Sequence, residues 1–485
     1  MGKATKAGSP QTTRLWDFAE VELAGPSERN PFTEVRFGAA FRNGAREVRV
    51  PGFSDGDGRY KVRFMPDQEG EWSYETYSSA AALSGKTGTL NATAAAQGVH
   101  GPVQVHPPYS FEYADGTPFF PVGTTCYAWT HQSAQLQENT VSILKSGPFN
   151  KIRMCVFPKH YSYNKNEPDH YVYEGGPGSF DFTRFNPAYF EAFEHRIAQL
   201  RDLGIEADII VFHPYDRWGF ATMSAEQDDL YLEYLVARLS AFRNVWWSFA
   251  NEWDLMKEKT TADWDRYFRI VQRADPYQHL RSIHNCRVFY DHNKAWVSHL
   301  SVQHSEVERV DEWRSQYGKP VVIDECCYEG DIQHNWGNIT AQELVRRMWE
   351  TTVRGGFPTG HGETYLNPDD VLWWAKGGIL RGESPARFGF LREIMEQAPL
   401  GDLRPERVGR MHPVLCKPGE WYMYCTGVRQ PSIFDLDLPA DGEYAVDMID
   451  TWNMTTDRLK GACSGMTRIE LPGKPWMAVR AVRAA

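Results

Sequence analysis

Short apolar runs separated by turn residues dominate the first hundred residues of the chain. Segments at 34–37, 46–50 and 60–64 alternate apolar and polar residues or end after a few positions, with Gly, Asp and Pro between them. Strands of this length with frequent turns are typical of a β-sandwich. We therefore predict an N-terminal β-sandwich over residues 1–100, followed by a linker of small residues.

From residue 101 the pattern changes to apolar strands that alternate with amphipathic helical segments. The helical spacing is clearest at 187–200, which ends before Gly204, and at 261–273, which opens with residues suited to an N-cap. This alternation is the pattern of βαβ units, and eight such units over 101–397 predict a (β/α)8 barrel. The predicted strands are 119–124, 151–157, 206–212, 245–250, 280–284, 300–304, 320–324 and 356–361.

Residues 398–485 return to short strands and turns, with apolar runs at 420–425, 443–450 and 476–482. This pattern predicts a second β-sandwich. The expected fold class is therefore a multidomain protein in which a central (β/α)8 TIM barrel, mixed α/β, is flanked by N-terminal and C-terminal β-sandwich domains.

Two of the predicted barrel strands end in a glutamate. The apolar run at 244–250 leads to Asn251 and Glu252, and the run at 320–324 leads to Glu325. A strand buried on both faces rarely finishes on a charged residue unless function requires it. Active sites of (β/α)8 enzymes lie at the carboxyl ends of the strands, where strands four and seven face each other. A retaining glycosidase needs such a pair, one acid and one nucleophile, with carboxyl groups about 5.5 Å apart.

The other strand ends carry residues that can bind sugar hydroxyls or stack on sugar rings. Histidines near six of the eight strand ends indicate a polar site, with a metal site as the rival interpretation. The sequence has no HxH or HExxH spacing, so we expect no metal and no cofactor. The candidate substrate-binding residues are Asn251, His304, His213, Arg217, Trp218, Trp129, His131, Arg153, His160, His284, His361, Glu363, Tyr365, Trp373 and Trp374.

Composition and charge limit the classes of partner that we expect for the protein. The net charge of -11 argues against nucleic acid, and no apolar run approaches the length of a membrane span. The N-terminus has no apolar signal-peptide region, so we expect a cytoplasmic protein, and the eight cysteines lack zinc-finger spacing. With 17 Trp in the chain, aromatic surfaces for a carbohydrate substrate are plentiful. We also allow for a homo-oligomer.

The residues around the two glutamates resemble a known clan. Asn251 and Glu252 after an apolar fourth strand, with Glu325 closing the seventh, are similar to the retaining glycoside hydrolases that include cellulase-like and β-galactosidase-like families. The segment 70–74, the barrel opening at 119–125 and the small C-terminal sandwich resemble glycosidases with an apiosidase-like barrel. The resemblance implies that Glu252 is the acid/base, Glu325 the nucleophile and Asn251 a ligand of the sugar 2-hydroxyl, with His304 beside the nucleophile.

This division of labour requires different protonation states of the two glutamates. Glu252 must hold a proton near neutral pH, so we expect flanking aromatic residues and the charge of Glu325 to raise its pKa. Glu325 must stay ionised, and His304, Arg153 and His284 are the expected donors.

The expected function is therefore a retaining, exo-acting glycoside hydrolase for oligosaccharides from plant or microbial polysaccharides, acting by double displacement through a covalent glycosyl-enzyme on Glu325. Two alternatives remain open. One is a non-catalytic carbohydrate-binding scaffold, which covalent labelling of Glu325 by a fluorosugar would exclude. The other is a metal-dependent hydrolase built on the histidines, which sensitivity to EDTA would reveal.

Overall fold

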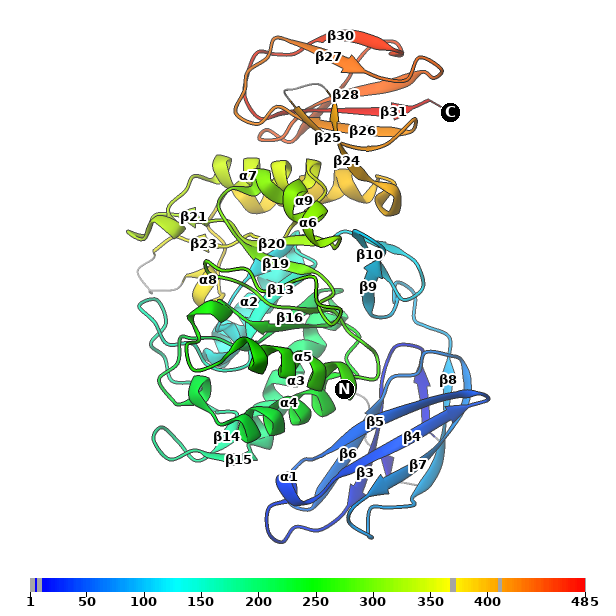
Figure 1. The fold of residues 1–485 in the computed structure, drawn as a ribbon, viewed down its shortest axis with the longest axis vertical. Helices are drawn as coiled ribbons and strands as arrows, with labels where there is room; N and C mark the ends of the chain where they lie inside the picture. The colour runs from blue at the N-terminus through cyan, green and yellow to red at the C-terminus, as the bar shows by residue number, and fades with distance from the viewer. Residues whose placement is uncertain (1–4, 7–10, 367–371, 409–411, 485) are drawn as a thin grey trace.

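A computed structural model describes residues 5–6, 11–366, 372–408 and 412–484 of the chain. Three bodies follow one another along the long axis of the molecule: an N-terminal sandwich, a central barrel and a C-terminal sandwich (Figure 1). The predicted fold class, a (β/α)8 barrel flanked by two strand-rich domains, is confirmed.

The N-terminal domain is an eight-stranded sheet folded into two layers, and one long strand belongs to both. Strand β5 pairs with β4 through residues 46–51 and with β6 through residues 52–54. Inward-facing aromatic residues such as Phe41, Phe64 and Trp72 fill the space between the layers. The strands are β1 (Thr5–Lys6), β2 (Gln11–Arg14), β3 (Ala19–Ala24), β4 (Phe37–Asn43), β5 (Arg46–Ser54), β6 (Arg59–Phe64), β7 (Gly70–Ser78) and β8 (Thr87–Thr93), with helix α1 (Pro31–Glu34) between β3 and β4.

The barrel consists of a five-stranded and a three-stranded parallel sheet joined at both edges. Parallel bridges between His284 and Ser301 and between Thr124 and His361 close the ring. Its strands are buried along their whole length, as expected where helices cover the outer face. They are β12 (Gly123–Thr125), β13 (Lys151–Cys155), β16 (Glu206–Phe212), β17 (Val245–Ala250), β18 (Arg281–Ser282), β19 (Leu300–Gln303), β20 (Val321–Glu325) and β22 (Phe357–Pro358).

Helices follow most of the barrel strands and cover the barrel. Several begin at side-chain caps; Thr260 and Asp263, for example, form a capping box at the start of α5. Residues 283–299, between β18 and β19, contain no helix. The helices are α2 (Ala134–Ser146), α3 (Pro187–Asp202), α4 (Ala225–Leu239), α5 (Thr261–Ala274), α6 (Val310–Tyr317), α7 (Ala341–Val353), the short α8 (Trp373–Lys376) and α9 (Ser384–Glu396).

Several short strands lie outside the barrel ring. The predicted first strand, 119–124, combines parts of one such strand, β11, and of the barrel strand β12, and is therefore wrong in extent. Phe119 belongs to β11, which pairs with β10 in an antiparallel sheet, and the barrel strand begins at Gly123. Gly123 lies so close to Thr359 that a Cβ there would come within 2.7 Å of the threonine side chain. The short strands are β9 (Val103–His106), β10 (Ser110–Tyr113), β11 (Pro118–Phe119), β14 (Tyr173–Glu174), β15 (Asp181–Phe185), β21 (Glu329–Gly330) and β23 (Glu363–Thr364).

The C-terminal domain packs one face of its larger sheet on the barrel. Along β26, Tyr422 and Tyr424 enter the core of the domain, whereas Trp421, Met423 and Cys425 join the core of the barrel, next to α7. This period-two alternation serves two cores with one strand. The strands are β24 (Arg404–Val408), β25 (His412–Lys417), β26 (Trp421–Cys425), β27 (Ile433–Asp437), β28 (Tyr444–Asp450), β29 (Thr455–Arg458), β30 (Met466–Glu470) and β31 (Met477–Arg483).

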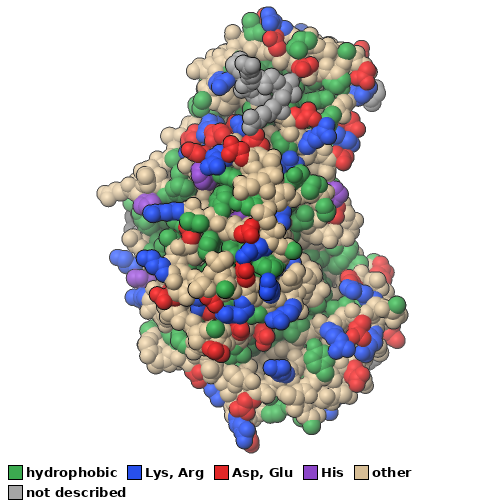
Figure 2. Space-filling model, viewed as in Figure 1, with side chains coloured by type: hydrophobic (Ala, Val, Ile, Leu, Met, Phe, Trp, Pro, Cys, Tyr) green, Lys and Arg blue, Asp and Glu red, His purple; other side chains and the backbone are tan. Residues whose placement is uncertain are grey.

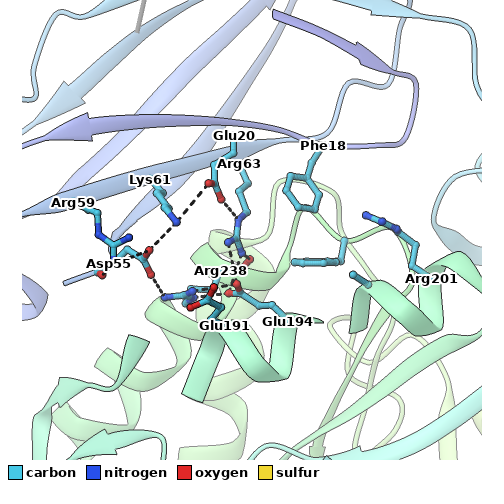
Figure 3. A pocket seen from close by; sticks show the side chains of 12 residues that line it. Phe18, Glu20, Asp55, Arg59, Lys61, Arg63, Glu191, Glu194, Arg201 and Arg238 are labelled. Atoms are coloured by element: carbon cyan, nitrogen blue, oxygen red, sulfur yellow. Dashed lines mark hydrogen bonds and ion pairs between the residues drawn. The ribbon is translucent and has the colours of Figure 1, made fainter. Parts of the chain in front are cut away.

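A buried ionic network joins the N-terminal sandwich to the barrel beside a cavity of about 120 Å³ (Figure 3). Glu194, on α3 of the barrel, accepts a hydrogen bond of 2.9 Å from Arg63 of β6 and one of 3.1 Å from Arg238 of α4. Arg238 also donates to Asp55 at 2.9 Å, and Arg63 to Glu20 at 2.7 Å. This cavity lies at the domain interface and away from Glu252 and Glu325.

We expect Glu194→Gln to lower the free energy of unfolding by about 3–5 kcal/mol, because two buried guanidinium groups would lose their shared counter-charge. Burial raises the pKa of Glu194, but Arg238 and Arg63 outweigh it and hold this pKa at about 2. Since the folded pKa is depressed, the stabilisation is present above pH 4.5 and is lost as the pH falls towards 2.

Denaturant unfolding of the wild type and Glu194→Gln at several pH values measures this contribution. Glu191→Gln, an exposed position on the same helix, is the matched control. A variant within about 0.5 kcal/mol of the wild type at pH 7 would contradict a stabilising role of the network.

The outer surface carries both signs of charge, and basic and acidic side chains are interspersed over the face shown in Figure 2. Within the described ranges, no helix is long and apolar enough to cross a bilayer. All eight cysteines are free, and six of them are buried.

Candidate active site

The two glutamates lie at the carboxyl ends of β17 and β20. Glu325 is the last residue of β20, and Glu252 follows β17 by two residues. Both are buried, with 4% and 7% of their surface exposed. Glu252 has φ 56°, in the left-handed region that residues other than glycine seldom adopt, and such strain concentrates at functional sites. The N–H of Trp253 donates to the carbonyl of His284 at 3.0 Å and holds this turn.

Hydrogen-bond donors and basic side chains lie next to the carboxylate of Glu325. Its Oε1 accepts a hydrogen bond from the hydroxyl of Tyr127, and its Oε2 accepts one of 3.2 Å from the indole of Trp336. A guanidinium nitrogen of Arg153 lies 3.6 Å from Oε1, and Nε2 of His284 lies 3.7 Å from the same oxygen. Arg153 and His284 therefore lie where the sequence placed them as neighbours of Glu325.

The protonation of Glu325 differs from the expected state. Burial raises the pKa of Glu325 to about 8, although the side chains of Tyr328 and Trp336 oppose this rise. The expectation that Glu325 stays ionised near neutral pH is therefore wrong for the free protein, because desolvation outweighs the donors around the carboxylate. Burial therefore disfavours the charged form, which a nucleophile requires, although Arg153 lies 3.6 Å away.

We expect Glu325→Gln to stabilise the protein at pH 8 and to leave its stability unchanged at pH 4. Because the folded pKa is raised, the unfolded chain loses the proton near pH 4.5 and the folded one near 8. Between these values the wild type loses up to about 1.4 kcal/mol per pH unit, which the neutral amide does not lose. Thermal melting of both proteins from pH 4 to 9 measures the difference, and a variant less stable than the wild type at pH 8 would contradict the raised pKa.

Three polar side chains hold the carboxylate of Glu252. The hydroxyl of Tyr215 and the side-chain amide of Asn251, at 3.2 Å, donate to Oε2. The side-chain amide of Gln303 donates to Oε1 at 3.3 Å. Each donor follows or ends a different barrel strand or lies beside the glutamate itself, so the barrel fixes the orientation of this carboxyl group.

A chain of hydrogen bonds links the two glutamates. The hydroxyl of Tyr127 lies within bonding distance of both Glu325 and Oδ1 of Asn251, at 3.0 Å from the latter. Asn251 in turn donates to Glu252. A phenol has one proton, so Tyr127 donates to one of its two acceptors at a time, and Arg153, 3.5 Å from Oδ1, can serve Asn251 instead. The two carboxyl groups are thus joined through two side chains, Tyr127 and Asn251.

A buried ionic layer beneath Glu325 positions Arg153. Lys151 donates to Asp208 at 2.5 Å and to Asp324 at 2.9 Å, and Arg153 lies 3.7 Å and 3.9 Å from the same two carboxylates. Burial raises the pKa of Asp324, but Lys151 and Arg153 outweigh it and leave this pKa below its ordinary value. The layer therefore keeps Arg153 pointing at the base of the site.

Two of the predicted sugar-binding histidines bond to protein groups. His131 bonds the carbonyl of Val156 at 3.0 Å, and His361 bonds the hydroxyl of Thr124 at 2.7 Å. Burial lowers the pKa of His131 to about 4 and that of His361 to about 3, so both rings are neutral at pH 7. Both rings are buried and bond to protein groups, and sugar binding by them stays a prediction.

Two further predicted histidines, His304 and His213, also bond to backbone groups of the protein. His304 donates its backbone N–H to the carbonyl of Glu325 at 2.9 Å, but its ring accepts the N–H of Glu306 and packs on Trp313. Its expected contact with the nucleophile is therefore made by the backbone. His213 bonds the carbonyl of Phe157 at 3.1 Å, and a sugar contact through its other ring nitrogen stays a prediction.

Of the tryptophans predicted to stack on sugar, two lie in the barrel core and one lies beside the site. Trp129 and Trp373 are 0% and 1% exposed and belong to the barrel core, and stacking of these two rings on sugar stays a prediction. Trp374 is half-buried, with its ring 5.9 Å from that of Tyr127 and 5.5 Å from that of Tyr328. It therefore lies beside the groups that contact Glu325, and its stacking role stays a prediction.

The last candidates bind other protein groups. Glu363 accepts the backbone N–H groups of Arg381 and Gly382, and Tyr365 donates to Glu329 at 3.0 Å. For both residues the sugar contact stays a prediction. Three predicted residues remain. The rings of His160 and Trp218 lie 6.2 Å apart, and Arg217 pairs with Glu167. Sugar binding by these three residues stays a prediction.

Sequence reasoning missed four side chains that hold the glutamates: Tyr127, Tyr215, Gln303 and Trp336. Tyr127 and Tyr215 follow β12 and β16, and Gln303 ends β19, so the strand-end rule that selected the histidines also covered them. Trp336 lies in a short 3₁₀ helix in the loop after β20, and no local pattern distinguishes it.

The arrangement can support acid/base and nucleophilic chemistry on one bond, because two buried carboxyl groups lie at the same end of the barrel and are linked by hydrogen bonds. Within the described part of the chain, no group of three or more His, Cys, Asp or Glu residues is placed to hold a metal ion. Two glutamates at the ends of the fourth and seventh strands of a (β/α)8 barrel define the glycoside hydrolase class.

The chain belongs to the apiosidase-like family of glycoside hydrolases. The model of the apiosidase-like catalytic domain matches residues 108–381. Two domains of unknown function flank it, DUF5060 at residues 12–79 and DUF5605 at residues 411–482.

Solved structures show the same architecture. A candidate glycoside hydrolase from Bacteroides vulgatus ATCC 8482 is 36% identical, with a TM-score of 0.92 over 98% of this chain and 100% of that one. A glycoside hydrolase family 5 protein from the same organism is 15% identical, with a TM-score of 0.62 over 79% of this chain and 94% of that one, and shares the fold. A search of curated proteins gives no match.

Proposed function

We propose that the protein is a retaining glycosidase in which Glu325 is the nucleophile and Glu252 the acid/base. The observation that carries this assignment is the hydrogen-bonded link from Glu325 through Tyr127 and Asn251 to Glu252. It joins two buried carboxyl groups at the same end of one barrel, which supports their action on one glycosidic bond.

In the first step Glu325 attacks the anomeric carbon while Glu252 protonates the departing oxygen, which yields a covalent glycosyl-enzyme. In the second step Glu252, now ionised, takes a proton from water, and the water displaces Glu325 with net retention. Binding of the sugar 2-hydroxyl by Asn251 is supported by the bonds of its side chain to Tyr127 and Glu252.

The raised pKa of Glu325 fits this mechanism. The transition state carries positive charge on the sugar ring, and an adjacent positive charge favours the carboxylate. Burial destabilises the ionised form of Glu325 in the free protein, and the transition state stabilises it. Tyr127, Trp336 and Arg153 provide fixed dipoles and charge around it.

We further propose exo-action on oligosaccharides from plant or microbial polysaccharides. The rings of Tyr161, Tyr163 and Trp374 lie 5.4–5.8 Å from one another, in contact on one side with Tyr127. Such a cluster can stack on a terminal sugar and restrict the passage of a long chain. Product analysis on oligosaccharides distinguishes release of terminal residues from internal cleavage.

Hydrolysis of nitrophenyl glycosides, pyranosides and furanosides in both anomers, tests the assignment. The wild type is expected to cleave one sugar class, and the first product seen by NMR should have the anomeric configuration of the substrate. A first product of opposite configuration would exclude the double-displacement mechanism.

A further inference from the structure

A lysine beside the two glutamates is enclosed by aromatic rings. Lys159 lies four residues after β13 and is 2% exposed. Its ammonium nitrogen is 3.4 Å from the ring centroid of Tyr127, 4.2 Å from that of Tyr215, 4.8 Å from that of Tyr161 and 5.8 Å from that of Trp374. The four rings form an aromatic cage around one positive charge.

This ammonium has no counter-charge within ion-pair distance and no hydrogen-bond acceptor among the residues of the described ranges. Two other buried lysines have such a counter-charge. Lys151 pairs with Asp208 at 2.5 Å and with Asp324 at 2.9 Å, and Lys259 pairs with Asp228 at 2.5 Å. Burying an uncompensated ammonium is costly, and ring contacts offset only part of that cost. A lysine kept in this state has three free donors for a ligand.

The cage also places Lys159 where a substrate would lie. The hydroxyl of Tyr127 bonds Glu325 and that of Tyr215 bonds Glu252, so two of the cage walls are the groups that hold the two carboxyls. Arg153 already lies 3.6 Å from Glu325, and the carboxylate of Glu252 is held by other donors. Neither glutamate forms an ion pair with Lys159, so its ammonium stays available to a ligand. Burial lowers the pKa of Lys159 to about 8, so the group is still charged at pH 7.

We propose that Lys159 binds a carboxylate of the sugar, so that the substrates are glycosides of uronic acids. This assignment rests on the proposed function of the two glutamates. Sugar hydroxyls could satisfy the N–H donors of the ammonium, but only an anionic group would also compensate its charge. The cation–π contacts then hold the ammonium in place before the substrate binds.

Calorimetric titration with free monosaccharides tests the proposal without turnover. The probes are D-glucuronate, D-galacturonate and D-mannuronate, each compared with the neutral hexose of the same configuration. The wild type is expected to bind one uronate at least about tenfold more tightly than its neutral partner. Lys159→Met should abolish this preference and change the affinity for the neutral sugar by less than about threefold.

Two further variants make the result specific. Lys159→Gln keeps hydrogen-bond donors and removes the charge, so it should also lose the preference, and it replaces Lys159→Met if that variant does not fold. Lys145→Met removes an exposed lysine of α2 and should behave as the wild type. Equal binding of uronates and neutral sugars by the wild type, no uronate binding, or a preference that survives both Lys159 variants would overturn the proposal. Failure of the proposed function would appear separately, as absence of Glu325-dependent hydrolysis.

Discussion

Replacing Glu325 with glutamine is expected to lower kcat/KM for any glycoside that the enzyme hydrolyses by at least about 10⁴-fold. Glutamine has nearly the same shape but no anionic oxygen to attack the anomeric carbon. Its amide can still be satisfied, because it can accept from Trp336 and donate to Tyr127, which then donates to Asn251. The loss should therefore be chemical, and release of nitrophenol from the active substrate measures it.

Glu306→Gln is the matched control, because Glu306 is exposed and lies shortly after β19. It should keep wild-type kinetics. The melting curve of Glu325→Gln at pH 8, expected to be at or above that of the wild type, separates loss of chemistry from loss of fold. Activity of Glu325→Gln within tenfold of the wild type would remove Glu325 from the role of nucleophile.

Replacing Glu252 with glycine is expected to lower kcat/KM by about 10²–10⁴-fold on substrates whose leaving group needs a proton, and far less on dinitrophenyl glycosides. Glycine is chosen because φ is 56° at this position, where glycine is unstrained, and because it leaves room for a small anion. Azide should then intercept the glycosyl-enzyme and give a glycosyl azide with retained configuration, detected by NMR.

The dependence on leaving group is the decisive readout. Glu258→Gln, an exposed change a few residues along the chain, should alter neither the rate nor this dependence. If Glu252→Gly slowed good and poor leaving groups equally, or if azide had no effect, Glu252 would not be the acid/base. A structural role alone does not distinguish between leaving groups.

The barrel and the catalytic pair could be predicted because local sequence decides them. The run at 245–250 is apolar at almost every position, as a strand covered on both faces requires, so Glu252 stood out at its end. Glu325 stood out for the same reason. The capping box at Thr260 likewise depends on residues three positions apart.

The surroundings of the pair could not be predicted, because they depend on contacts between distant segments. His131 and His361 follow barrel strands as Tyr127 does, but their rings turn into the packed core. Which way a side chain points after a strand depends on the local turn, and the sequence pattern does not specify it. The raised pKa of Glu325 was missed for a related reason, since it is a balance between burial and donors from several loops.

Covalent trapping of the nucleophile tests the central claim most directly. A 2-deoxy-2-fluoro glycoside of the active sugar with a dinitrophenyl leaving group slows both steps, but the good leaving group lets the glycosyl-enzyme accumulate. The account predicts a mass increase of one fluorosugar, located on the peptide that contains Glu325 and absent in Glu325→Gln. A label on any other residue, or steady turnover of the parent sugar with no label, would contradict it.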